Sequence, residues 1–211
     1  MRVALIGATG LVGSKILEEL LFRNHVVTAI VRDTNKVPSG PGVNSLRCDI
    51  MDTPALTRAI RGHECVIGAF SGKGQPDVYE GYLAAFRSVV EATRQAGVAR
   101  LLMVGGAGSL QVSPGVDYVD TAAFPERARP GSLAVRAALE LLRKGSGITW
   151  TMLSPSMFAP GSRTGEFRTG LDTLLTDAQG NSAISLEDYA VAFVNEIEEP
   201  RHLDRRFTVG Y

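Results

Sequence analysis

Three glycines near the start of the chain have the spacing of a loop that binds a dinucleotide phosphate. Gly7, Gly10 and Gly13 follow the apolar run at 3–6 and stand where a helical pattern begins. Glycine permits a tight turn, close approach of a pyrophosphate to the backbone, and close packing of the helix on the strand. The free N–H groups at the helix start then face the anion. The residues expected to form this contact are Gly7, Thr9, Gly10, Leu11, Val12 and Gly13.

The pattern around this loop predicts strands that alternate with helices. Short β-rich runs end at glycine or polar turns, and apolar residues between them recur every three or four positions. The expected strands are 3–6, 25–31, 45–48, 65–70, 100–104, 148–153 and 207–209, and helices are expected to begin near 11, 53, 79, 132 and 185. Thr53 is expected to cap the second helix, Gly97 to end the third and Ser185 to cap the last. This order predicts the α/β class, as a three-layer, Rossmann-type, doubly wound parallel sheet forming a single domain over 1–211.

Two long segments, 105–131 and 155–183, lack a clear periodic pattern. Each follows a predicted strand, so each leaves the carboxyl edge of the sheet, where open α/β folds bind ligands. Loops of this length inside a compact domain are commonly functional lids. We therefore expect both segments to act as substrate loops.

Composition narrows the classes of function. The 211 residues carry 22 Lys and Arg against 22 Asp and Glu, so no charge excess favours nucleic acid or an anionic membrane surface. No apolar run reaches the length of a membrane span, and two cysteines are too few for a disulfide framework. We expect a cytoplasmic protein that binds a small-molecule partner and no metal. The sequence does not indicate its oligomeric state.

The glycine spacing is G-x-x-G-x-x-G, and several further segments share a pattern with it. They are Ala4–Gly13, Val31–Asp33, Cys48–Ile50, Leu153–Pro155, Ile184–Ala190 and Arg206–Tyr211. With these segments the chain resembles the short-chain dehydrogenase/reductase superfamily on its atypical NAD(P)-binding branch. Within that branch it resembles the bacterial NADH-flavin reductases, which are similar to biliverdin reductase B.

The resemblance implies a set of cofactor contacts. Asp49 and Ile50 would flank the adenine, and the ribose and nicotinamide would be bordered by Ala69, Phe70, Ser71, Gly105, Gly106, Ser154, Pro155, Ser156 and Met157. Arg32 stands at the end of the second strand, where an acid would bind the ribose of NAD, and its guanidinium can hold the 2′-phosphate of NADP. The sequence therefore favours NADP, with the alternative that Asp33 turns inward to the ribose.

The superfamily usually carries Tyr-x-x-x-Lys, in which the tyrosine is the acid toward a carbonyl. Here the matching positions fall at Gly131 and about Val135, so the acid that alcohol–ketone chemistry and epimerisation require is missing. Hydride transfer to a flavin is less demanding, because the ring is itself the electron sink and water can supply the proton. We expect an NAD(P)H-dependent oxidoreductase acting on flavin or a flavin-like planar acceptor. The alternative is a non-catalytic NADP-binding sensor.

Candidates for the acceptor side lie near the carboxyl ends of strands. Ser109 and Ser154 are the candidate catalytic hydroxyls, and Phe124, Phe158 and Arg163 are the candidate substrate contacts. An aromatic residue in a long loop can instead cover the core, and that alternative stays open for both phenylalanines. The loop at 71–74, Ser-Gly-Lys-Gly, lacks the full pattern of a phosphate-binding Walker loop and is expected to be mobile.

Overall fold

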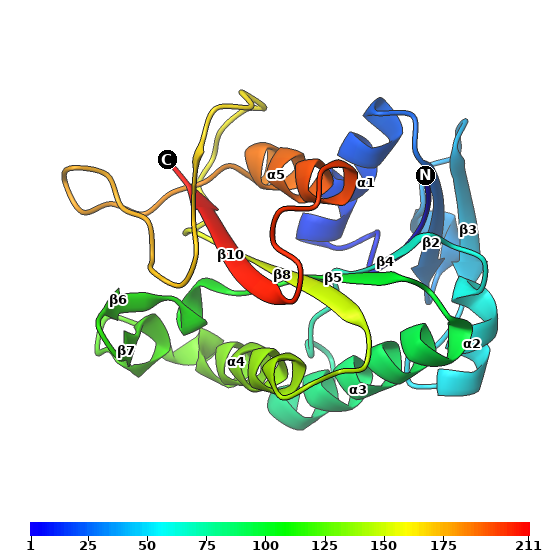
Figure 1. Ribbon diagram of the computed structural model, residues 1–211, viewed down its shortest axis with the longest axis horizontal. Helices are drawn as coiled ribbons and strands as arrows, with labels where there is room; N and C mark the ends of the chain where they lie inside the picture. The colour runs from blue at the N-terminus through cyan, green and yellow to red at the C-terminus, as the bar shows by residue number, and fades with distance from the viewer.

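An eight-stranded sheet forms the centre of the molecule (Figure 1). The structure is a computed structural model that describes residues 1–211. The strand order is β3-β2-β1-β4-β5-β8-β10-β9, and every pairing is parallel except that of β10 with β9. The strands are β1 Arg2–Ile6, β2 Val26–Val31, β3 Val43–Arg47, β4 Cys65–Gly68, β5 Arg100–Val104, β8 Thr149–Pro155, β9 Arg168–Gly170 and β10 Arg205–Gly210. The predicted Rossmann-type doubly wound fold is confirmed.

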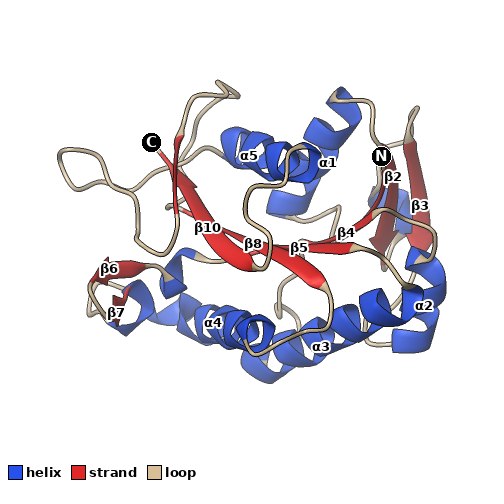
Figure 2. Ribbon diagram, viewed as in Figure 1, coloured by secondary structure: helices blue, strands red, loops and turns tan.

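Helices cover both faces of the sheet and complete three layers (Figure 2). Helices α1 (Leu11–Phe22) and α5 (Leu186–Glu198) pack side by side on one face. Helices α2 (Thr53–Ile60), α3 (Val78–Ala96) and α4 (Arg129–Arg143) cover the other face. The order of the strands reverses between β1 and β4, so the glycine loop after β1 lies at the point where such folds bind ligands.

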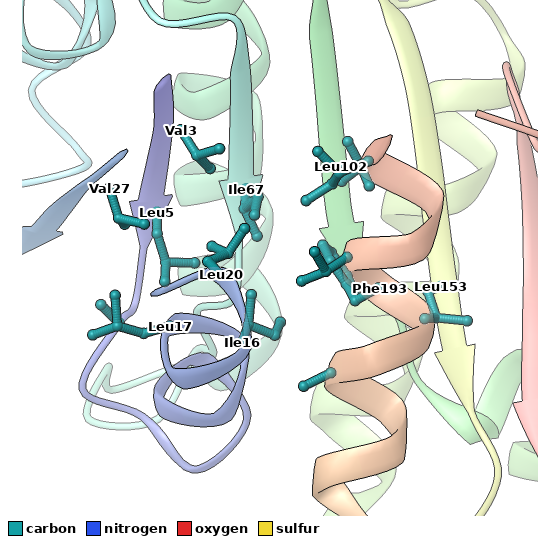
Figure 3. Packing of buried hydrophobic residues seen from close by; sticks show 14 of the residues in the cluster. Val3, Leu5, Ile16, Leu17, Leu20, Val27, Ile67, Leu102, Leu153 and Phe193 are labelled. Carbon is teal, nitrogen blue, oxygen red and sulfur yellow. The ribbon is translucent and has the colours of Figure 1, made fainter. Parts of the chain in front are cut away.

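The two faces of the sheet have separate apolar cores because side chains alternate along each strand. On β1, Val3 and Leu5 join the cluster under α1 and α5, which Figure 3 shows in close-up, while Ala4 and Ile6 join the cluster under α2, α3 and α4. Neither face of β1 is exposed to solvent, since these four side chains are at most 1% exposed.

Most helix ends follow the sequence pattern, with one correction. Helix α3 ends at Gly97 in the left-handed conformation (φ 67°), and the Ser185 hydroxyl caps α5 by accepting from the Asp188 N–H at 3.0 Å. Helix α2 is capped by Asp52, which accepts from the Ala55 N–H at 2.9 Å, and not by Thr53 as predicted. Thr53 is the first helical residue, and its hydroxyl bonds Ser88 at 2.8 Å.

The two long segments contain short elements that the sequence pattern did not predict. Segment 105–131 forms the hairpin of β6 (Gln111–Ser113) and β7 (Val116–Asp117), and segment 155–183 contains the edge strand β9. They meet where the Gln111 N–H donates to the Asp172 carbonyl at 2.8 Å and the Leu174 N–H donates to the Gln111 carbonyl at 2.9 Å. The two predicted loops are therefore joined to each other.

None of the helices combines the length and the apolar character required to cross a lipid bilayer.

Candidate functional site

A cleft of about 420 Å³ opens at the carboxyl ends of β1, β2 and β4. Four separate segments bring predicted cofactor contacts into its wall: Gly7, Thr9 and Gly10; Arg32; Asp49 and Ile50; and Ala69, Phe70 and Ser71. The opposite wall includes the small residues Gly81 and Ala85 of α3. The cleft is therefore continuous from the start of α1 to the ends of β2 and β3.

The glycine loop has the geometry that a backbone phosphate site requires. Gly7 is in the left-handed region (φ 84°), and a Cβ there would lie 2.4 Å from the Ala69 carbonyl oxygen. A Cβ on Gly13 would lie 2.1 Å from the Gly7 carbonyl oxygen, so this glycine allows α1 to pack on the turn. Gly10 is the N-cap residue of α1 and provides no side-chain cap. The first N–H groups of α1 are therefore available to an anion.

Leu11 and Val12 can reach this site through their backbone only. The Leu11 side chain is 71% exposed, and Val12 is half-buried against the core. Neither side chain lines the cleft. Their N–H groups belong to the first turn of α1, where no intrahelical acceptor exists.

Two adjacent charged residues at the end of β2 have different surroundings. Asp33 accepts from the Asn35 N–H at 3.1 Å and lies 3.9 Å from the Lys36 ammonium, so it caps the turn that follows β2. Arg32 lines the cleft, and its guanidinium has no carboxylate within 4.0 Å. The residue that faces the cleft is therefore the cation.

Lys73 is a second cation at the cleft, and sequence reasoning missed it. It lines the cleft together with Gln75 and has no carboxylate partner. The signal was present as a lysine within the Ser71–Gly74 loop directly after β4, which was interpreted only as a mobile loop. Gly72 closes this loop tightly, because a Cβ there would lie 2.2 Å from the Val78 carbonyl oxygen.

The residues expected beside the nicotinamide lie on neighbouring strand ends but do not line the cleft. The Gly105 N–H donates to the Leu153 carbonyl at 2.8 Å, and a Cβ on Gly105 would lie 2.6 Å from the Ser154 Oγ. Ser154 is fully buried and its hydroxyl has no hydrogen-bond partner. The neighbouring positions differ in exposure: Pro155 and Ser156 are buried, whereas Met157 and Phe158 are each 38% exposed.

The three proposed substrate contacts are placed apart from one another. Phe124 is 6% exposed and packs edge-on against Tyr118, with the rings 5.0 Å apart, so it covers the core. Phe158 packs edge-on against Tyr189. Arg163 forms an ion pair with Glu19 of α1 at 2.8 Å, and its guanidinium lies 4.9 Å from the ring centroid of Phe22. None of these three side chains lines the cofactor cleft.

Helix α4 packs directly on the segment after β5, where the superfamily's tyrosine and lysine would act. The Val135 side chain lies 3.6 Å from where a Cβ on Gly106 would be, and Ser132 lies 2.8 Å from a Cβ on Gly108. The nearby Tyr189 hydroxyl donates to the Leu153 carbonyl at 2.7 Å, and burial raises the pKa of Tyr189 well above its ordinary value. No tyrosine–lysine acid is formed here.

Parallel strands wound in two directions, a glycine loop at the switch point and a cleft beside it define a Rossmann-type nucleotide-binding protein. The comparison with families agrees. The chain belongs to the NAD(P)H-binding family, whose model matches residues 7–200.

Individual relatives cover the whole chain. A Bacillus subtilis protein, the uncharacterized YwnB, is 37% identical over 99% of this chain and 98% of its own length. A Bacteroides thetaiotaomicron structure described as a candidate epimerase has a TM-score of 0.93 and 38% identity, covering 100% of this chain and 96% of that one. A Streptococcus pneumoniae structure described as a candidate NADH-flavin reductase has a TM-score of 0.87 and 32% identity, covering 100% and 99%.

Proposed function

We propose that this chain is an NADPH-dependent reductase that transfers hydride to a flavin or a flavin-like planar acceptor. One observation carries the proposal: Val135 of α4 packs against Gly106, at the position where the superfamily has its lysine. The strand ends next to the nucleotide cleft therefore have no tyrosine–lysine acid. A planar acceptor needs the two rings to be stacked and oriented, and solvent can supply its proton. The Streptococcus pneumoniae neighbour supports this choice, because its description names a flavin reductase.

The acceptor side would be formed by the ends of β5 and β8. Gly105 and Gly106 directly follow β5, and the hydroxyls of Ser109 and Ser154 lie beside them. Phe158, which is 38% exposed and follows the end of β8, is the aromatic side chain that we propose contacts the acceptor. Ser154, Pro155, Ser156 and Met157 would border the nicotinamide, as the family resemblance implies.

The proposed cofactor preference is for NADPH over NADH. A 2′-phosphate needs cationic donors, and both Arg32 and Lys73 line the cleft without a carboxylate partner. Asp33, the residue that would favour NAD, caps the next turn instead. We also propose a cytoplasmic location, supported by the unpaired thiols of Cys48 and Cys65.

Steady-state oxidation of NADPH with FMN, FAD and small quinones tests this function. We expect acceptor-dependent loss of NADPH in the native protein and none in the Gly10→Val variant, whose glycine loop is blocked. Tight NADPH binding without turnover on any acceptor would overturn the proposal and support the sensor alternative. An epimerase activity is not proposed, because the site lacks the acid that the superfamily uses.

A further inference from the structure

Arg206 is a buried cation that the cofactor cleft does not use. It lies on β10, is 4% exposed, and faces the side of the sheet covered by α4. A buried guanidinium is costly unless its donors are paired. Its Nε donates to the Asp172 carboxylate at 2.8 Å, and its Nη1 donates to the carbonyl and the Oγ of Ser109 at 2.9 and 3.2 Å.

The contact with Ser109 decides how that hydroxyl can act. A guanidinium only donates hydrogen bonds, so the Ser109 Oγ accepts from Arg206 and keeps its own proton for another acceptor. The only protein acceptor for that proton is the Gly106 carbonyl, at a long 3.4 Å. A positive charge beside an oxygen also stabilises negative charge on it. Ser109 is therefore a polarised hydroxyl whose proton makes only one long hydrogen bond within the protein.

Asp172 connects Arg206 to both long loops. Its carboxylate also accepts from Arg143 of α4 at 2.9 Å, while its backbone carbonyl accepts from Gln111. The Asp172 side chain is 47% exposed, so water weakens its neutralisation of the buried Arg206. Ser109, Asp172, Arg143 and Arg206 line one hollow of about 690 Å³, which shares no residue with the cofactor cleft.

We propose that Arg206 is a positioning residue, which fixes Ser109 and makes its hydroxyl the group that stabilises the negative charge of the reduced acceptor. This assignment rests on the proposed reductase function. Hydride brings two electrons and one hydrogen from NADPH to the acceptor, as a C–H bond of the dihydronicotinamide breaks and a bond to hydrogen forms on the acceptor. The acceptor is then an anion, Ser109 donates a hydrogen bond to it, and water supplies the second hydrogen as a proton.

The charge effect can be measured without turnover by placing a thiol at this position. In a Ser109→Cys variant, ultraviolet absorbance of the thiolate gives the pKa of the new thiol. We expect a value below about 8, against about 8.5 for a free cysteine. The native thiols do not interfere, because burial raises the pKa of Cys65 to about 12 and that of Cys48 above its ordinary value.

One control variant and two double variants isolate the effect of Arg206. Ser154→Cys places a thiol at another buried position without a charged partner, and its pKa should lie above 8.5. Adding Arg206→Met to Ser109→Cys should raise the thiol pKa, whereas adding Asp172→Asn should lower it, so the test survives if either double variant does not fold. A thiol pKa at or above that of the control would overturn the proposal.

Kinetics with FMN then separate this proposal from the proposed function. We expect Ser109→Ala to lower kcat less than about a hundredfold, Arg206→Met to add nothing further in that background, and KM for NADPH to stay unchanged. Native turnover combined with an ordinary thiol pKa would overturn only the assignment of Arg206. A low thiol pKa in a native protein that reduces no acceptor would support the electrostatic role of Arg206 and contradict the reductase function.

Discussion

The nucleotide cleft and the two long loops are built on different principles. In the cleft, the glycine loop presents backbone groups and the cations Arg32 and Lys73 have no protein partners. At the loops, charged side chains are already engaged: Arg163 pairs with Glu19 of α1, and Asp172 and Ser109 of the loops bind Arg206 of β10. The charged side chains of the cleft are therefore free to bind a ligand, whereas those at the loops are neutralised by other residues of the protein.

The glycine loop gives the largest expected effect. A Gly10→Val substitution should weaken NADPH binding by more than about a hundredfold, because the branched side chain occupies the space of the pyrophosphate. The fold should survive, since a Cβ at this position meets only the Gly7 carbonyl oxygen at 3.3 Å and the Ala69 oxygen at 3.9 Å. Calorimetry measures binding, and circular dichroism is the control for folding. Retained NADPH affinity would mean that the glycine loop has only a structural role.

Replacement of Arg32 should give the second-largest effect, on the preference between the two nucleotides. Arg32→Ala should narrow the preference for NADPH over NADH by roughly ten- to a hundredfold, because a charge-assisted hydrogen-bond pair contributes about 1.5 to 3 kcal/mol. Fluorescence titration with both nucleotides measures the change, and Asp33→Asn is the matched control, expected to leave the preference intact. Equal affinities in the native protein would favour a ribose contact from Asp33.

The acceptor side should be tolerant of single changes. Replacement of Ser109, Ser154 or Tyr118, one at a time, should lower kcat by less than about a hundredfold, because orientation of the rings supplies most of the rate. Phe158→Ala should weaken acceptor use more than cofactor binding. A loss of several thousandfold at any one of the three hydroxyls, with NADPH affinity intact, would reveal a dedicated acid and contradict a mechanism based on orientation.

Lys73 should have a smaller effect than Arg32. It is exposed, so water screens its charge, and Lys73→Met should weaken NADPH binding by roughly fivefold while affecting NADH less. The same titration measures it, with the distant exposed Lys144→Met as control. An equal loss for both nucleotides would place the ammonium at the pyrophosphate instead of the 2′-phosphate.

The ion pair of Arg163 with Glu19 should contribute to the free energy of unfolding. Its hydrogen bonds to Glu19 hold the pKa of that buried carboxyl below its ordinary value, despite the opposing effect of burial. A carboxyl with a lowered folded-state pKa stabilises the fold above its unfolded-state pKa, and this contribution is lost as the pH falls through the folded-state value.

The Arg163→Ala variant should therefore lose about 1 kcal/mol of unfolding free energy at neutral pH. The difference from the native protein should shrink in acid, as the pH falls below about 4.5, the ordinary value for a glutamate. Denaturant titration across pH measures both, and Arg201→Ala, in an ion pair whose two side chains are more than 70% exposed, should change little. A difference that is constant with pH would show that Arg163 acts by packing on Phe22.

The fold and the nucleotide cleft could be predicted because their determinants are local in sequence. The spacing of Gly7, Gly10 and Gly13 specifies a turn and a helix start, and Arg32 follows directly from the end of a strand. The acceptor side depends on partners far along the chain: Arg163 meets Glu19, 144 positions away, and Arg206 meets Ser109, 97 positions away. No periodic pattern encodes such pairs, so the engagement of Arg163 could not be predicted.

An anaerobic single-turnover experiment measures hydride transfer from NADPH to a planar acceptor. The native protein is mixed with NADPH and FMN, and loss of nicotinamide absorbance and of oxidised flavin absorbance are followed together. We expect both signals to fall at the same rate, NADPH deuterated at C4 to slow them equally, and the Gly10→Val variant to show neither change. NADPH that binds in the cleft but remains unoxidised in the presence of FMN and other planar acceptors would contradict the proposed reductase function.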